Sequence, residues 1–103
     1  MNKIPYETRK EVYLRAVQVN GLDKQLIVAL EEFSEVQKEI CKFLRGKGSV
    51  ANLAEEIADA TIMLEQLRLF TGLAPAVCNQ MDLKVARLAR DLGIRLEGDT
   101  DGQ

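Results

Sequence analysis

Residues 23–44, DKQLIVALEEFSEVQKEICKFL, and residues 49–70, SVANLAEEIADATIMLEQLRLF, decide the fold of this chain. In both segments apolar residues recur every three or four positions, which is the period of an amphipathic helix. No part of the sequence sustains the two-residue alternation of a strand. Asp23 and Ser49 are the expected N-caps of the two helices, which should end near Leu44 and Phe70.

Shorter helices are expected on either side of this pair. The first covers Glu7–Val19 and stops at Asn20-Gly21, a pair typical of a helix C-terminus. The last begins near Pro75, a residue that suits the first helical turn, and ends near Gly93. Because short connections favour antiparallel neighbours, the sequence predicts an all-α protomer resembling an antiparallel four-helix bundle.

The length of 103 residues corresponds to one domain, expected over residues 1–95, with a polar and disordered tail at 96–103. A domain of this size has a small core, so association with further copies would help to stabilise it. The net charge of -2 argues against binding to nucleic acid. Because the sequence has no signal peptide and no apolar run that could span a membrane, we expect a cytoplasmic protein.

The chain contains no histidine, and this absence restricts its chemistry. Catalytic triads that use histidine as the base are excluded, as are zinc sites built on imidazole. Di-iron bundles are disfavoured because their usual ligand pattern is Glu-x-x-His. Any metal would therefore bind mostly through oxygen atoms, which favours Mg²⁺ or Mn²⁺.

Two acidic pairs recur with the same spacing, Glu32-x-x-Glu35 in the first helix of the central pair and Glu56-x-x-Asp59 in the second. Residues three positions apart lie on one face of a helix, so two antiparallel helices can bring four carboxylates together. A divalent cation would offset their repulsion, bind phosphate and activate water. The alternative is a solvated acidic face, which is common on helices.

A helical wheel of residues 49–70 distinguishes most clearly between a metal site and a solvated acidic face. At about 100° per residue, Glu56 falls inside the apolar arc, where an isolated charge is costly unless it is paired, protonated or coordinated. Asp59 lies at the edge of that arc, and Glu55 points away from it. On the first helix, Glu32 flanks the apolar arc and Glu35 lies further round.

Glu39 shares the edge of the first helix with Glu32 and Glu35, and is a candidate for an additional contact to the metal or its water. A phosphate-binding site also needs positively charged side chains. Candidates are Arg45 and Lys47 in the loop of the central pair, and Lys84 and Arg87 on the last helix. For each basic side chain, the alternative is a stem that covers apolar surface while its charge stays in water.

The two acidic pairs form an ExxE motif that is followed, after twenty residues, by an ExxD motif. This arrangement resembles the signature of the MazG-like all-α nucleoside triphosphate pyrophosphohydrolases, and the likeness extends over Leu26–Leu67. The resemblance implies a Mg²⁺-dependent enzyme, with Mn²⁺ as an alternative, that hydrolyses a nucleoside triphosphate to monophosphate and pyrophosphate. It also implies a homo-oligomer, dimer or tetramer. The implied roles are metal binding by Glu32, Glu35, Glu56 and Asp59, activation of water by Glu35, and phosphate binding by Lys84 and Arg87.

Two other functions fit the same sequence. A helical interaction module would use the acidic faces for solvation or for basic partners, but it gains nothing from a carboxylate inside an apolar stripe. A degenerate relative of the enzymes would bind nucleotides without turnover, although all four acids of the pattern are present. Neither the preferred base nor the preferred sugar can be inferred from these residues.

Overall fold

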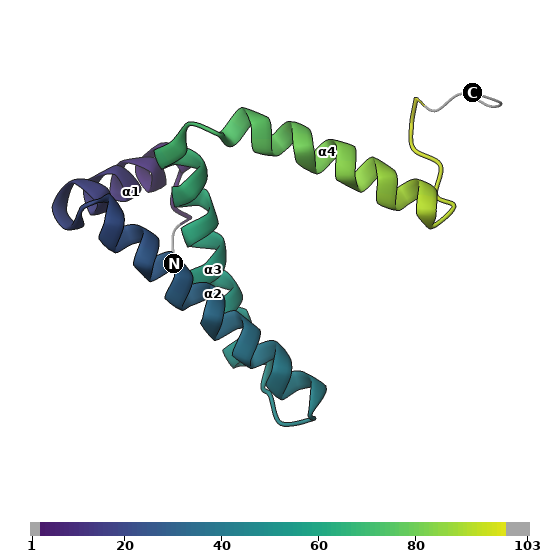
Figure 1. Ribbon diagram of the computed structural model, residues 1–103, viewed down its shortest axis with the longest axis horizontal. Helices are drawn as coiled ribbons and strands as arrows, with labels where there is room; N and C mark the ends of the chain where they lie inside the picture. Colours follow the sequence, from purple (N-terminus) through teal and green to yellow (C-terminus); the bar gives the residue numbers. More distant parts are fainter. Residues whose placement is uncertain (1–2, 99–103) are drawn as a thin grey trace.

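The computed structural model describes residues 3–98, and within this range the chain forms four helices and no strand (Figure 1). The helices are α1 (Tyr6–Asn20), α2 (Leu22–Leu44), α3 (Val50–Thr71) and α4 (Ala74–Asp91). The all-α prediction is confirmed, with helix ends within one or two residues of those expected. Residues 99–103 of the expected disordered tail lie outside the described residues.

Among the four helices, α3 alone has a side-chain cap at its N-terminus, whereas α1, α2 and α4 begin without one. Ser49 caps α3, since its Oγ accepts a hydrogen bond of 3.0 Å from the backbone N–H of Asn52. Gly72 ends α3 in the left-handed region at φ 69°, a conformation that costs glycine nothing. The expected N-cap at Asp23 is wrong, because α2 already begins at Leu22. Asp23 lies in the first turn instead, where its charge still favours the helix.

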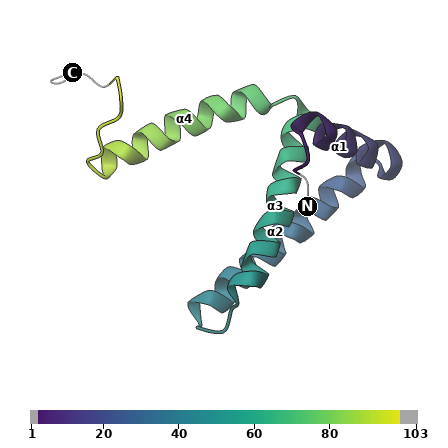
Figure 2. The ribbon, with the colours of Figure 1, turned by 180° about the vertical axis from the view of Figure 1, so that it is seen from behind.

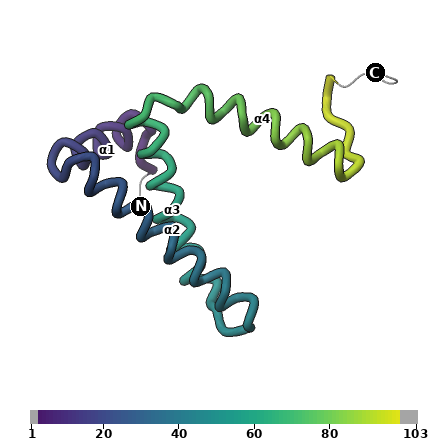
Figure 3. Tube along the Cα trace, viewed as in Figure 1, coloured from purple at the N-terminus to yellow at the C-terminus, as the bar shows by residue number. Residues whose placement is uncertain are grey.

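Helices α2 and α3 lie side by side as an antiparallel hairpin, and α1 spans the end opposite their connecting loop (Figures 1 and 3). Ala29 of α2 and Ala60 of α3 are buried, as is the larger Met63 of α3. The expected apolar stripes are only partly covered by this packing. Among their members, Leu30, Ile57 and Leu64 are exposed, so part of each stripe faces away from the seam.

The attachment of α1 to α3 depends on Tyr13, which is 6% exposed. Its hydroxyl donates a short hydrogen bond to Oε2 of Glu65, and Oε1 of the same carboxylate is 3.3 Å from Nη1 of Arg9. Burial, together with the hydrogen bond to Glu65, raises the pKa of Tyr13 to about 12. The phenol therefore stays protonated and remains a donor at neutral pH.

Replacing Tyr13 with phenylalanine should weaken this attachment without changing its shape. A hydrogen bond to a charged group contributes about 1.5 kcal/mol or more, and we expect a loss of that order in the free energy of unfolding. Urea unfolding monitored by circular dichroism measures it. The exposed Tyr6 provides the control, since Tyr6→Phe should leave the unfolding midpoint unchanged. Equal stability of the Tyr13→Phe variant and the native chain would contradict this role.

Helix α4 projects away from the other three helices, as both faces of the molecule show (Figures 1 and 2). Within the described residues it packs against α3, with Nη2 of Arg68 3.5 Å from Sδ of Met81, and its first turn borders a hollow that Tyr6 and Tyr13 of α1 also line. The expected four-helix bundle is therefore wrong for a single chain. Because only Gly72 and Leu73 connect α3 to α4, the left-handed turn at Gly72 directs α4 outward and away from α2.

The single chain consequently buries little apolar surface. Its radius of gyration is 17.6 Å, whereas a compact domain of this length has one of roughly 13 Å. Its accessible surface is 8367 Å², against roughly 5,800 Å² for a compact monomer of the same mass. No large side chain among the described residues is fully buried. The apolar stripe of α4 is exposed along its length, at Met81, Val85, Leu88 and Leu92.

None of the helices between residues 3 and 98 combines the length and the apolar character needed to cross a bilayer. The longest of them, α2 and α3, are interrupted by the charged residues described below.

Candidate metal centre

Three of the four predicted metal ligands converge at the middle of the α2–α3 seam. Glu32 of α2 and Glu56 and Asp59 of α3 each offer a carboxylate oxygen, and these oxygens lie within 4.8 Å of one another. All three residues are half-buried. The spacing of three positions places Glu56 and Asp59 on one face of α3, and the antiparallel packing brings Glu32 opposite them.

The pKa values of Glu32 and Glu56 are raised by partial burial and by the charges of neighbouring acids. Partial burial is the main cause that raises the pKa of Glu32, followed by the charges of Asp59 and Glu56 and a hydrogen bond with Asp59. Partial burial also raises the pKa of Glu56, followed by the charges of Asp59 and Glu35. Without a cation, the cluster therefore holds protons more tightly than separate carboxylates in water do.

These shifts predict a pH dependence of stability for the metal-free protein. A carboxyl whose pKa is higher in the folded state stabilises the fold at pH values below its ordinary pKa of 4.5. This contribution to stability is lost as the pH rises through the raised pKa. Glu32→Gln removes one charge from the cluster. In EDTA, this variant should match the native melting temperature near pH 4 and exceed it at pH 7.

Thermal denaturation at a series of pH values tests this expectation. Glu31→Gln is the matched control, because Glu31 is exposed on the other side of the same helix turn and should give no such crossover. A Glu32→Gln variant that follows the native curve at every pH would show that the three carboxylates do not interact in solution.

The other two acids of α2 differ in their surroundings. Glu35 flanks the cluster but is not one of the three converging residues, and its Oε1 lies 3.3 Å from Nζ of Lys38. Glu39 is 7% exposed, and its Oε1 lies 3.2 Å from Nζ of Lys42. Its other oxygen, Oε2, is buried and has no hydrogen-bond partner among the described residues. A buried carboxylate oxygen without a partner is costly, which fits a group that binds something further.

The predicted phosphate-binding residues lie apart from the cluster in the single chain. Arg45 and Lys47 belong to the α2–α3 loop, more than one helical turn beyond Glu56 along the hairpin. Lys84 and Arg87 are exposed on α4, which does not contact α2. In the described part of the chain, none of these four side chains forms an ion pair with the acids of the cluster.

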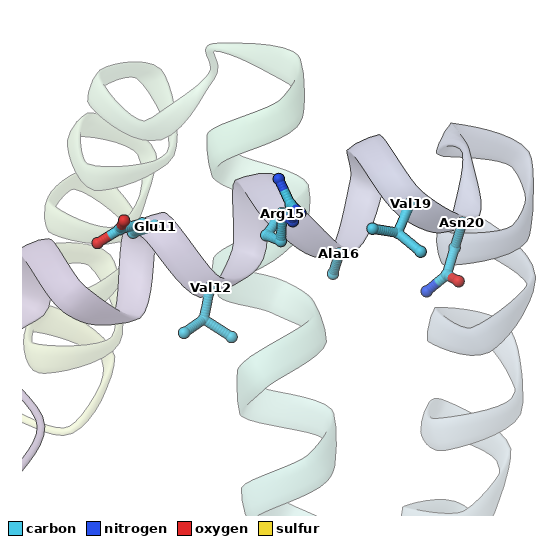
Figure 4. Close-up of a pocket in the computed structure, with 6 residues that line it drawn as sticks. All are labelled: Glu11, Val12, Arg15, Ala16, Val19 and Asn20. Carbon is cyan, nitrogen blue, oxygen red and sulfur yellow. The ribbon is translucent and has the colours of Figure 1, made fainter.

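The hollows beside α1 include two of different composition. One is lined entirely by residues of α1, including Glu11, Val12 and Arg15, and contains no residue of the acidic cluster (Figure 4). The other is a cavity of about 560 Å³ between α1 and α3, and Gln66 lines it. Gln25 and Gln66, both buried, were not identified from the sequence. Their positions seven residues from Glu32 and Asp59 are the sequence signal that could have indicated them.

Comparisons of the chain with protein-family models, with curated proteins and with solved structures gave no match.

Proposed function

We propose that this chain is a divalent-metal-dependent nucleoside triphosphate pyrophosphohydrolase of the MazG-like all-α type. The products would be a nucleoside monophosphate and pyrophosphate. The observation that carries the proposal is the convergence of Glu32, Glu56 and Asp59 on one point of the seam, at the spacing that resembles this family.

The surroundings of the three acids support a cation at this point. The two lysines that pair with acids nearby, Lys38 and Lys42, bind Glu35 and Glu39 instead, so the three converging carboxylates have no basic partner among the described residues. The unpaired Oε2 of Glu39 adds a further buried acceptor on the same helix. Half-buried carboxylates without a basic partner gain most from a hard divalent cation.

The donor set fits Mg²⁺, with Mn²⁺ as the alternative, because it consists of carboxylate oxygens only. Glu32, Glu56 and Asp59 would hold the ion. Bound there, it supplies charge neutralisation and polarisation of the phosphate oxygens. An open, half-buried position leaves room for substrate and water beside the ligands.

Glu35 is the proposed base. It lies on α2 one turn from Glu32, and its charge acts on both Glu32 and Glu56. Its side chain is 47% exposed, so water can reach it. A carboxylate in this position can orient the attacking water and accept its proton, while the cluster fixes the phosphates.

The basic residues would stabilise the charge on the phosphates. Arg45 and Lys47 lie at the loop end of the same hairpin, and their long side chains would have to extend toward the phosphates of a bound substrate. Lys84 and Arg87 cannot reach it from the outward position of α4 within one chain. In this proposal, α4 of a second copy places them opposite the acids, where their charges complement the cluster.

The large uncovered surface of the single chain supports a homo-oligomer, either a dimer or a tetramer. The single chain exposes on the order of 2,500 Å² more than a compact monomer, and standard interfaces bury roughly 800 Å² on each partner. The uncovered surface is therefore more than enough for a stable association. Apolar residues of α2 and α4, among them Leu30 and Leu88, would supply the contacts.

The experiment that tests the proposed function measures pyrophosphate release from a panel of ribo- and deoxyribonucleoside triphosphates, with and without Mg²⁺. We expect turnover of at least one nucleotide, and its loss in EDTA with recovery on adding Mg²⁺. If no nucleotide is hydrolysed, the enzyme proposal fails. Nucleotide binding without turnover would then indicate a degenerate binder, and its absence an interaction module.

A further inference from the structure

A chain of three amides links α1, α2 and α3 about two helical turns from the acidic cluster. Nδ2 of Asn20 donates to Oε1 of Gln25 at 3.0 Å, and Nε2 of Gln25 donates to Oε1 of Gln66 at 2.9 Å. Gln25 and Gln66 are 7% and 6% exposed. In this arrangement the oxygen of Gln66 faces Gln25, and its nitrogen is directed elsewhere.

Gln25 and Gln66 lie on the same sides of α2 and α3 as the acids of the cluster, about two helical turns further along. Gln25 precedes Glu32 by seven residues on α2, and Gln66 follows Asp59 by seven residues on α3. Seven residues advance a helix by about 10.5 Å and return to within roughly 20° of the same direction. Gln66 therefore lies two turns from the acidic cluster on the same side of α3, which suits the reach from the phosphates of a nucleotide to its base.

Gln66 lines the cavity of about 560 Å³ between α1 and α3. Its walls include the apolar side chains of Val12, Ala16 and Ile62, and the first two point to the same side of α1 (Figure 4). A largely apolar cavity of this size with few polar groups is typical of a small-molecule site. Ala58, the residue that precedes Asp59 on α3, lines it too, so along α3 the cavity begins one residue from the acidic cluster.

The remaining polar groups of the cavity already have partners within the protein. Arg9 and Tyr13 both bind Glu65, and the hydroxyl of Thr61 donates to the carbonyl of Ile57. Within residues 3–98, Nε2 of Gln66 has no such acceptor. The cavity thus offers a ligand the amide nitrogen of Gln66 between apolar walls, with the ion pair of Arg9 and Glu65 at its side.

We propose that this cavity holds the nucleobase and that the amide nitrogen of Gln66 selects bases carrying a ring carbonyl over those carrying an amino group at the same position. This inference rests on the proposed function. The ligand class is the keto bases: uracil, thymine, guanine and hypoxanthine. An amino group would face Nε2 donor to donor, which leaves both groups unpaired. Gln25 is a positioning residue, since it does not line the cavity and acts only through Gln66.

The experiment compares kcat/KM for matched pairs of triphosphates, deoxyuridine with deoxycytidine and inosine with adenosine. In each pair the bases differ in an oxo or amino group at one ring position. We expect the keto member to be preferred by at least about tenfold in both pairs, because an unpaired buried donor is costly. The ratio within a pair does not depend on how much of the protein is folded. A preference below threefold in both pairs would overturn the proposal.

The variant Gln25→Glu tests the orientation directly. A carboxylate at residue 25 cannot donate to Gln66, so the amide of Gln66 should turn, donate to residue 25 and present its oxygen to the cavity. The preference should then shift at least tenfold toward the amino bases. Gln66→Met should bring both ratios close to one. Gln37→Glu, the same change at an exposed position of α2, should keep the native ratios.

Retention of the native ratios by both Gln25→Glu and Gln66→Met would overturn the proposal. These outcomes are separate from failure of the proposed function. If nucleotides are hydrolysed in a Mg²⁺-dependent way but the keto and amino bases are treated alike, only this inference fails. If nothing is hydrolysed, the proposed function fails with it.

Discussion

Replacing Glu56 with glutamine is expected to lower pyrophosphate release by at least about a thousandfold, because loss of a metal ligand removes several kcal/mol of charge stabilisation. The same change should stabilise the metal-free protein at neutral pH. Glu56 is held half-buried beside Asp59, and partial burial and the charges around it raise its pKa. An amide of the same shape removes that repulsion. Initial-rate assays at saturating Mg²⁺ and thermal denaturation in EDTA measure the two effects.

Glu55→Gln is the matched control. Glu55 is the preceding residue on α3, is exposed, and is not one of the three converging acids. Its variant should keep native activity. If Glu56→Gln retains native activity, or if Glu55→Gln loses as much, Glu56 is not a metal ligand and the site lies elsewhere.

The second large effect concerns assembly. We expect the chain to sediment at no less than twice its monomer mass of 11.5 kDa, because so much apolar surface is uncovered in one copy. Leu88→Asp places a charge in the middle of the apolar stripe of α4, and burying an unpaired charge is costly. The dissociation constant should rise by at least about a hundredfold. Sedimentation equilibrium over a range of concentrations measures it.

Asn79→Asp introduces the same charge on the opposite side of α4 and should leave the association unchanged. If Lys84 and Arg87 act on the partner's site, the dissociated Leu88→Asp variant should also lose activity in proportion to its monomer fraction. A native chain that is a stable monomer at all concentrations would contradict the assembly and the proposed role of Lys84 and Arg87.

Helix positions could be predicted from the sequence because they depend on local signals. The apolar period located α2 and α3, and Ser49, Gly72 and Pro75 marked helix ends through their own backbone and side-chain preferences. The half-buried position of Glu56 was also predictable, since it lies inside an apolar arc. Local periodicity thus indicated the site on α3 more firmly than the site on α2.

The features that depend on how helices meet could not be predicted. The sequence did not indicate that Ala29 and Ala60 would be buried while Leu30 is exposed. Nor did the apolar stripe of α4 reveal whether it would fold back on its own chain, because the periodicity is the same for a stripe covered by a partner. Gln25 and Gln66 were overlooked because amides look like surface residues until their partners are known.

The most direct test of the proposed metal centre is a calorimetric titration of Mg²⁺ into the purified metal-free protein and its Glu56→Gln and Glu55→Gln variants. We expect saturable binding to the native protein and to Glu55→Gln, with release of protons at mildly acidic pH because the cluster holds protons that the ion displaces. We expect no saturable binding to Glu56→Gln. Equal binding by all three proteins, or none by the native protein, would contradict a metal centre at Glu32, Glu56 and Asp59.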